Sequence, residues 1–350
     1  MYLNGIILQS VASIKGQRTI YGIYHLLKGK KSIQTIHDSR IYQVEGFYGI
    51  APTLNKADFE REIRKLESQE LIIARNKGSE FFFLTHSGMQ WIHQHDIPYT
   101  YYKGLTYSGV VDLFMERLML LIQTYTNSKK SNLSFIPIVD NEETLNWVKM
   151  QYRRTKTNGI EILPILYEEL YFILSQLKGH EAEMFVDRLT GYHTYGMSTH
   201  QLAEKYNMVE ADVKVLMVGI IHFIMSNIEK SPEKFQLLRV LLQGVTRRNF
   251  ITNSAKVTND LLKKGYSIEK VAKVRRLKVN TIQDHIVEIA LYNVDFPVEA
   301  YVDPETESEI IAAIRKTNSY KLRDIKEALD NQISYFQIRL VLSRNDVAIK

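Results

Sequence analysis

One segment near the C-terminal end places helix caps and apolar residues at regular spacing, over residues 258–290 (TNDLLKKGYSIEKVAKVRRLKVNTIQDHIVEIA). Gly265 can end a first helix, because glycine takes the left-handed conformation of a C-terminal cap without a Cβ penalty. Ser267 can cap a second helix, and after a short turn through Leu277 a third helix can begin at Asn280 or Thr281. The residues expected to face inward are Ile268, Val271, Ala272, Ile282, Ile286, Ile289 and Ala290. This order predicts a helix-turn-helix.

The charge of the same region indicates a polyanionic partner. Residues 251–290 hold eight cations and four anions, so they carry about +4 of the chain's net charge of +6. Cationic surfaces attract phosphate backbones because binding releases counterions. Four of the cations lie in or beside the predicted turn, where a helix-turn-helix meets the backbone: Lys273, Arg275, Arg276 and Lys278. We therefore expect a nucleic-acid contact here, and the alternative is a helical hairpin that only packs on its neighbours.

The third helix of this segment would present polar side chains to the bases, as the first turns of a recognition helix do. Lys278, Asn280, Gln283, Asp284 and His285 are expected on its outer face. Gln283 and His285 are the candidates for base contact. The whole set of candidate nucleic-acid-binding residues is Lys273, Arg275, Arg276, Lys278, Asn280, Thr281, Gln283 and His285.

The N-terminal third predicts a winged-helix-like module over about Ile14–His95. Its signal is three helical stretches followed by two short strands around a polar turn. The stretches are Thr19–Lys28, Ser32–Asp38 and Asn55–Gln69 for the helices, and 71–74 and 81–84 for the strands. Cations that could flank a nucleic-acid groove are Lys56, Arg61, Arg64, Lys65, Arg75 and Lys77. Acidic residues dilute this charge, so the module could equally contact protein.

The middle of the chain predicts an all-helical domain. Apolar periodicity marks Tyr107–Thr126, Glu142–Tyr152 and Glu161–Gln176, and the polar run Asn127–Asn132 is a candidate linker. A second helix-turn-helix, at Ser198–Phe223, resembles the DNA-reading region of sigma factors. Its second helix is apolar nearly all round, which is typical of a buried helix.

The fold class predicted is therefore mainly α, with tandem helix-turn-helix units at the C-terminal end. Lys321–Leu329 and Gln332–Ser343 supply a second helical pair there, and the proline-containing stretch Asp295–Glu309 is expected to be a connector. The expected domains are a winged-helix-like domain at 1–100, a helical middle domain at 101–250 and a helix-turn-helix domain at 251–350.

Several kinds of chemistry lack their sequence signals. The chain has no cysteine, which excludes disulfides and thiolate zinc sites. The run Lys28–Ser32 fails the spacing of a phosphate-binding loop, and no GxGxxG or HExxH occurs. We therefore expect no enzyme activity, no metal and no cofactor. No apolar stretch approaches the roughly 18 residues that span a bilayer, so we expect a cytoplasmic protein without a membrane contact.

The C-terminal segment also resembles a known module. The runs Gly265–Ala272, Thr281–Ile286, Lys321–Leu329 and Ser334–Val341 look like the helix-turn-helix appended to the C-terminus of many RecQ-type DNA helicases. A stand-alone chain of this size, with this tail and a winged-helix-like start, is similar to the YpbB family of Gram-positive bacteria. That family is associated with a short RecQ-type helicase that lacks its own C-terminal extension.

The resemblance implies a non-catalytic, DNA-binding accessory subunit of a RecQ-like helicase, acting in replication, recombination or repair. Two other interpretations remain open from the residues. One is a transcription regulator with tandem helix-turn-helix units, and the other is a protein-interaction scaffold that binds no nucleic acid.

Overall fold

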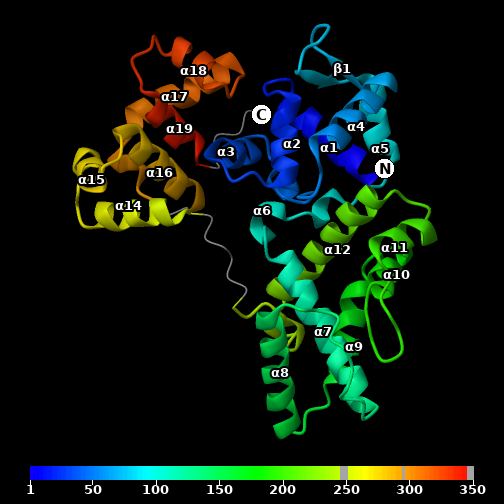
Figure 1. Ribbon diagram of the computed structural model, residues 1–350. Helices are drawn as coiled ribbons and strands as arrows, with labels where there is room; N and C mark the ends of the chain where they lie inside the picture. The colour runs from blue at the N-terminus through cyan, green and yellow to red at the C-terminus, as the bar shows by residue number, and fades with distance from the viewer. Residues whose placement is uncertain (245–250, 294–295, 345–350) are drawn as a thin grey trace.

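The protein is mainly helical, as the sequence predicts. The computed structural model describes residues 1–244, 251–293 and 296–344, and within these ranges one two-stranded hairpin accompanies the helices (Figure 1). Helices from the start, the middle and the end of the chain form three successive groups in the ribbon (Figure 1). The division into domains at 1–100, 101–250 and 251–350 stays a proposal.

The N-terminal group has the element order of a winged helix. Asn55 caps α4 with its side chain, which accepts the amide of Asp58 at 2.8 Å, and Ser32 caps α3 in the same way. The hairpin pairs Ile72 with Leu84 in antiparallel register. The elements are α1 (Tyr2–Ile14), α2 (Ile20–Lys28), α3 (Ile33–Ile41), the 3-10 turn η1 (Glu45–Phe47), α4 (Lys56–Ser68), β1 (Ile72–Ala74), β2 (Phe82–Leu84) and α5 (His86–Gln94).

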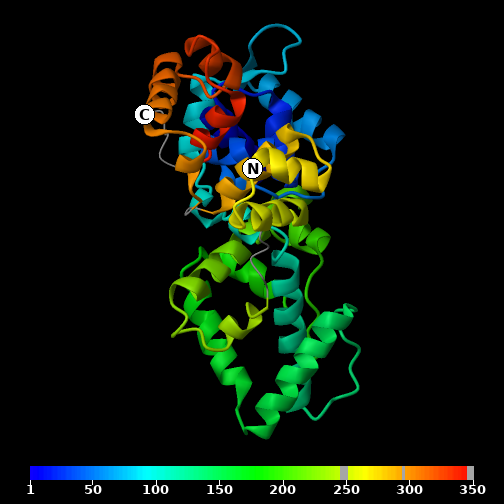
Figure 2. The same cartoon turned by 90° about the vertical axis from the view of Figure 1, so that its left-hand side faces the viewer.

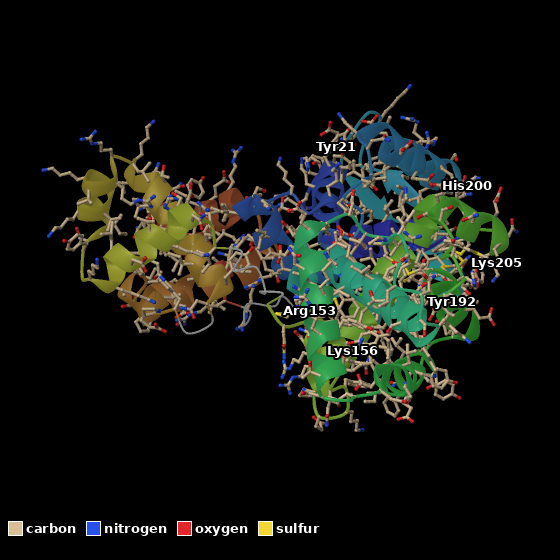
Figure 3. The ribbon with its side chains drawn as sticks, turned by 60° about the horizontal axis from the view of Figure 1, so that its bottom comes forward. Tyr21, Arg153, Lys156, Tyr192, His200 and Lys205 are labelled. Atoms are coloured by element: carbon tan, nitrogen blue, oxygen red, sulfur yellow. The ribbon has the colours of Figure 1, made fainter. Side chains whose placement is uncertain are left out.

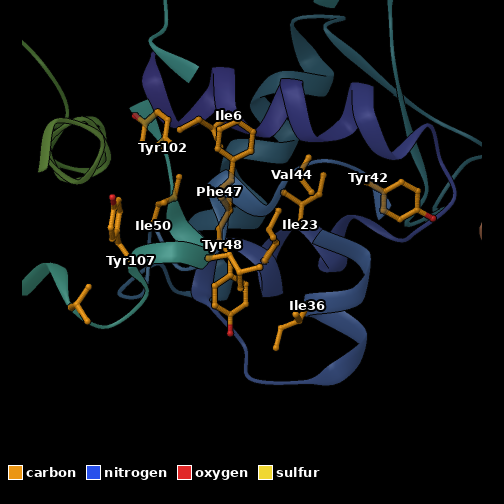
Figure 4. Close-up of a cluster of buried hydrophobic side chains, with 14 of the residues drawn as sticks. Ile6, Ile23, Ile36, Tyr42, Val44, Phe47, Tyr48, Ile50, Tyr102 and Tyr107 are labelled. Carbon is orange, nitrogen blue, oxygen red and sulfur yellow. The ribbon is translucent and has the colours of Figure 1, made fainter. Parts of the chain in front are cut away.

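Helix α1 was not predicted from the sequence, yet it is a central part of the core. Ile6, Ile7 and Leu8 are fully buried in it, and the helix packs on α2, α5, β2 and a long helix of the middle group, α12 (Glu210–Lys230). Figure 4 shows Ile6 of α1 beside residues of α2, α3 and the 99–107 region in one apolar cluster. Its apolar residues surround the helix on all sides, so the sequence shows no amphipathic stripe from which the helix could be predicted.

The middle group is assembled around α12. Ser198 caps α11 and Asn207 forms the turn before α12 with φ of 50°, so the predicted helix-turn-helix geometry is present. The other elements of this group are η2 (Tyr99–Tyr101), α6 (Gly104–Tyr107), α7 (Val111–Lys129), α8 (Glu142–Thr157), α9 (Ile162–Leu174), α10 (Gly179–Asp187), α11 (Thr199–Lys205) and α13 (Leu238–Leu241). The expected linker at Asn127–Asn132 is wrong in its first half, because α7 continues to Lys129 and Asn127 is buried.

Helix α12 corrects one expectation about membranes. By length and composition it is the one described helix that could cross a bilayer, with a mean hydropathy of 1.5. It lies inside the protein instead, and Val215, Leu216 and Ile220 are at most 1% exposed. Its apolar surface is used by α1, α7, α9, α10 and α11, which all pack against it. The predicted core role of this helix is therefore confirmed.

The C-terminal group contains six helices and a short 3-10 turn in its described part. They are α14 (Asn253–Lys263), α15 (Ile268–Arg275), α16 (Val279–Tyr292), η3 (Val298–Ala300), α17 (Pro304–Thr317), α18 (Leu322–Ala328) and α19 (Tyr335–Leu342). The expected connector at Asp295–Glu309 is wrong over its second half. Asp303 caps α17 by accepting the amide of Thr306 at 2.9 Å, and Pro304 fits the first helical position, which needs no amide donor. Asp295 lies outside the described residues.

The two ends of the chain are joined. Helix α16 packs on α3, and both ribbon views place the C-terminal helices beside the N-terminal group (Figures 1 and 2). Gln17 accepts the amide of Tyr320 at 2.8 Å, and the rings of Tyr42 and Tyr320 meet edge to face at 5.6 Å. Arg40 donates to the carbonyl of Leu291.

Candidate nucleic-acid interface

Helices α14, α15 and α16 form the helix-turn-helix near the C-terminal end. Gly265 follows α14 with φ of +81°, a conformation that a side chain would strain. Ser267 caps α15 by accepting the amide of Lys270 at 3.2 Å. Helix α16 begins at Val279, one residue before the predicted start. The caps and boundaries here follow from neighbouring residues, which is why the sequence located them closely.

The inner face of this unit is apolar and tightly packed. Helix α16 contacts α14, α15, α19 and α3, so it is the central helix of the group rather than a peripheral one. The residues expected inside are buried, except Ile268, which is half-buried: Val271, Ala272, Ile282, Ile286, Ile289 and Ala290.

Arg275 and His285 do not belong to the exposed set, which corrects the prediction for both. His285 is 8% exposed, and its Nδ1 lies 2.8 Å from the hydroxyl of Thr258. The Arg275 guanidinium donates to the carbonyl of Ser254 at 2.6 Å and to the hydroxyl of Thr258, and it lies 3.3 Å from His285 Nδ1. These side chains join α14, α15 and α16 in one polar network.

The position of His285 could have been read from the helical period. It follows Ile282 by three residues and precedes Ile289 by four, which places all three on one helix face. Burial lowers the pKa of His285, and the neighbouring Arg275 charge lowers it further. The imidazole is therefore neutral at physiological pH, as the acceptor role of Nδ1 requires.

The other predicted residues remain at the surface. Lys273, Arg276, Lys278 and Asn280 are exposed, and Thr281 and Gln283 are half-buried. We call Lys273, Arg276 and Lys278 the turn patch. In the described part of the chain none of these three cations forms an ion pair with a carboxylate, so their charges are available to a phosphate backbone.

The reading face of α16 is shorter than expected. Asp284, predicted to lie outside, is half-buried and pairs with Arg339 of α19 at 2.5 Å. Helix α19 thus covers the outer face of α16 beyond its first turns. What stays accessible is the N-terminal end, around Lys278 and Asn280, and this end is the part of a recognition helix that contacts base edges.

The N-terminal winged helix has a more balanced surface. On α4, Lys56 lies 3.5 Å from Glu60 and Arg61 lies 2.5 Å from Asp58. These pairs offset two of the four cations on the helix, and Glu62 and Glu67 balance the other two in charge. Long-range attraction of a polyanion to this face is accordingly weak, in contrast to the turn patch.

Comparison with known proteins agrees with this geometry. Residues 254–342 match a helix-turn-helix domain family, so the C-terminal group is a helix-turn-helix domain of a class that binds DNA. The chain is also similar to Protein YpbB of Bacillus subtilis (strain 168), with 30% identity over 346 residues that cover 98% of this chain and 97% of the relative. No solved structure matches the chain. The protein belongs to the YpbB family, as the resemblance in its sequence predicts.

Proposed function

We propose that this protein is a non-catalytic accessory subunit of a RecQ-like DNA helicase, acting in the bacterial cytoplasm in DNA replication, recombination or repair. The carrying observation is the helix-turn-helix domain, whose turn patch and first turn of α16 remain open to a partner. The similarity of this segment to the C-terminal module of RecQ-type helicases supports the helicase as protein partner. The chain would supply the C-terminal module that the short RecQ-type helicase lacks.

The turn patch is proposed to contact phosphates, and Asn280, Thr281 and Gln283 are proposed to lie near base edges. Phosphate contacts give affinity and salt dependence, whereas base contacts give specificity. Replacing Lys273, Arg276 and Lys278 together by Gln should therefore weaken binding to all duplex sequences. The plot of log affinity against log salt should flatten by about 0.9 for each lost contact.

Fluorescence anisotropy with duplex DNA across a salt series measures this change. A matched control replaces Lys103, Lys214 and Lys230, three exposed lysines of the middle group, by Gln and removes the same charge. Equal salt slopes for the wild type and the turn-patch variant would refute DNA binding through this patch.

The helicase assignment is tested separately. The tagged chain, purified from native lysate of its own organism, should retain a RecQ-like helicase, identified by mass spectrometry, and nuclease treatment should not release it. Recovery of RNA polymerase subunits without a helicase would favour the transcription regulator, and a partner set without any DNA binding by the chain would favour the scaffold.

A further inference from the structure

Helices α7 and α8 of the middle group run in the same direction, and their C-terminal ends lie side by side. The hydroxyl of Thr144 donates to Glu116 at 2.9 Å near the start of both helices, and the hydroxyls of Ser128 and Tyr152 lie 2.6 Å apart near their ends. The chain between α7 and α8 returns along the pair, so the C-terminal ends of both helices lie at the same end of the molecule. Figure 3 looks toward this end, with Arg153 and Lys156 labelled on α8.

Exposed cations gather at this end. We call the set the α7–α8 tip: it comprises Lys129, Lys130, Arg153, Arg154 and Lys156 at the helix ends, and Lys149 about two turns before the end of α8. The sequence has no Asp or Glu within 117–139 or 144–160. No ion pair joins any member to a carboxylate of the described residues. The nearest exposed acids are Glu161 and Glu168 at the start and in the middle of the next helix, α9, so the six cations of the tip outnumber them.

The helix dipole explains only part of this charge. Cations in the last turn of a helix are stabilised by the negative end of the dipole, and Arg154 and Lys156 occupy such positions in α8. The effect falls off within one turn, so it gives no reason for Lys149 to be a cation. A polyanionic ligand would account for the whole set.

The next helix exposes aromatic side chains instead of the polar face that a surface helix usually has. On α9, Tyr167 is 67% exposed and Tyr171 is 63% exposed, and their rings stack with centroids 5.9 Å apart and planes inclined by 20°. Helix α8 ends at Thr157 and α9 begins at Ile162. Five residue steps span at most about 18 Å, so the tip lies near the start of α9, and the tyrosine pair follows along that helix.

We propose that the α7–α8 tip and the Tyr167–Tyr171 pair form a binding surface for single-stranded nucleic acid, distinct from the C-terminal helix-turn-helix. Cations that follow a backbone and exposed rings on which bases stack are the two components of such surfaces. In a duplex the faces of the bases are stacked on one another, so they cannot stack on the tyrosines. An apolar protein partner would contact the tyrosine rings but would leave the cations of the tip without partners. The proposal does not depend on the helicase assignment.

The test uses the full-length protein and anisotropy of labelled 20-mers of oligothymidine and oligouridine. Replacing Arg153, Arg154 and Lys156 by Gln should weaken binding at least tenfold at about 0.1 M salt and flatten the salt slope by about 2, which is about 0.7 for each single-strand contact. The control with Lys103, Lys214 and Lys230 replaced by Gln should change affinity less than twofold.

A second pair of variants isolates stacking from charge. Replacing Tyr167 and Tyr171 by Ala should also weaken binding at least tenfold but leave the salt slope unchanged, because stacking releases no counterions. Replacing both by Phe keeps the rings and should keep the affinity, while Tyr195→Ala, at another exposed tyrosine, should have no effect. Thermal melts establish that each variant is folded.

The binding of the cation and tyrosine variants decides whether the proposal holds. Loss of binding in both the cation and the tyrosine variants supports the proposal, and comparison of the two oligomers shows whether DNA or RNA is preferred. If either variant binds the oligomers as the wild type does, or if the control cations matter equally, the proposal is overturned. Duplex binding by the turn-patch variant is a separate measurement, so failure here leaves the proposed function untouched.

Discussion

At the scale of single residues, Arg275 illustrates how a cation in a surface motif can serve the fold. Its guanidinium crosses from α15 to Ser254 and Thr258 of α14 and lies beside His285 of α16. A buried polar group that loses its partner keeps the cost of its lost hydration. Arg275 is accordingly expected to act on stability, unlike the exposed Lys273 two residues earlier.

Arg275→Ala should lower the free energy of unfolding by about 1–3 kcal/mol, because it leaves the buried Thr258–His285 pair short of a donor. Lys273→Ala should leave stability within about 0.5 kcal/mol of the wild type, as exposed substitutions generally do. Urea unfolding followed by circular dichroism compares the two. Unchanged stability of Arg275→Ala together with lost DNA binding would return Arg275 to the phosphate-contacting set.

Besides His285, two buried histidines make the fold sensitive to acid. Burial lowers the pKa of His222 to about 3, and the Lys103 charge contributes in the same direction. Burial also lowers the pKa of His37 to about 4 against the opposing charge of Asp38, and the charges of Arg339 and Arg18 act in the lowering direction. Both values lie below the unfolded value of about 6.5. At a pH between the folded and the unfolded pKa of each histidine, the unfolded chain binds a proton that the folded chain does not.

The free energy of unfolding should therefore be fully retained above about pH 6.5 and fall below it, by about 1.4 kcal/mol per pH unit for each histidine. Urea unfolding at pH 7.5, 6 and 5 gives the slope of stability against pH. His37→Gln should lower this slope by the contribution of His37. Identical stability at pH 7.5 and 5 would show that neither ring is held neutral by the fold.

At the scale of elements, α11 and α12 have the geometry of a DNA-binding motif but not its surface. The capping of α11 by Ser198 and the turn at Asn207 are as expected for a helix-turn-helix. Six other helices pack on the second helix, α1, α7, α9, α10, α11 and α13, and from α1 the amide of Leu3 donates to Asp212 at 2.8 Å. A helix whose apolar residues are mostly buried by its neighbours cannot enter a groove, so this unit supports the core.

Leu216→Asp should unfold the middle group, because a buried carboxylate without a partner costs several kcal/mol against a typical domain stability of about 5–15 kcal/mol. Lys214→Asp places the same carboxylate at an exposed position of the same helix and loses only a surface pair with Glu210, so it should leave the melting temperature nearly unchanged. Thermal melts by circular dichroism decide between the two. A Leu216→Asp protein that melts normally but fails to bind DNA would mean that α12 is an exposed reading helix.

At the scale of the whole molecule, segments some three hundred residues apart hold the ends of the chain together. The side chain of Gln17 accepts the amide of Tyr320 and donates to the carbonyl of Asn318 at 3.2 Å. Arg40 reaches the carbonyl of Leu291 and lies 5.4 Å from the centre of the Tyr292 ring. This junction sets the direction in which the helix-turn-helix domain faces.

Replacing Gln17 and Arg40 together by Ala should loosen this junction without unfolding either side. Hydrogen exchange read by mass spectrometry should show faster exchange in α3 and in residues 318–321, while α14 and the buried face of α16 keep their protection. Gln34→Ala, at a neighbouring position of α3 outside the junction, is the control. If hydrogen exchange in the double variant is unchanged, the apolar contacts alone hold the C-terminal helices against the N-terminal group.

The sequence by itself determined the features that depend on near neighbours. Ser267 caps the helix that it was predicted to cap, and Asn55 and Ser198 cap helices at the starts of the predicted segments. The hairpin after α4 lies where two short apolar runs around a polar turn indicated it. A cap needs an amide three residues away, and a helical face needs only a period of 3.6 residues. Such interactions are readable without knowing what packs against them.

The tertiary structure alone decided which surfaces remain open. Helix α14 holds Arg275 and His285 by hydrogen bonds, Arg339 of α19 pairs with Asp284, and α1 is buried by elements from two groups. A side chain on an outer helix face is exposed only if no distant segment packs over it, and that choice depends on long-range packing that local spacing does not specify. For this reason the turn patch and the first turn of α16 stay accessible, while the rest of the predicted reading face stabilises the fold.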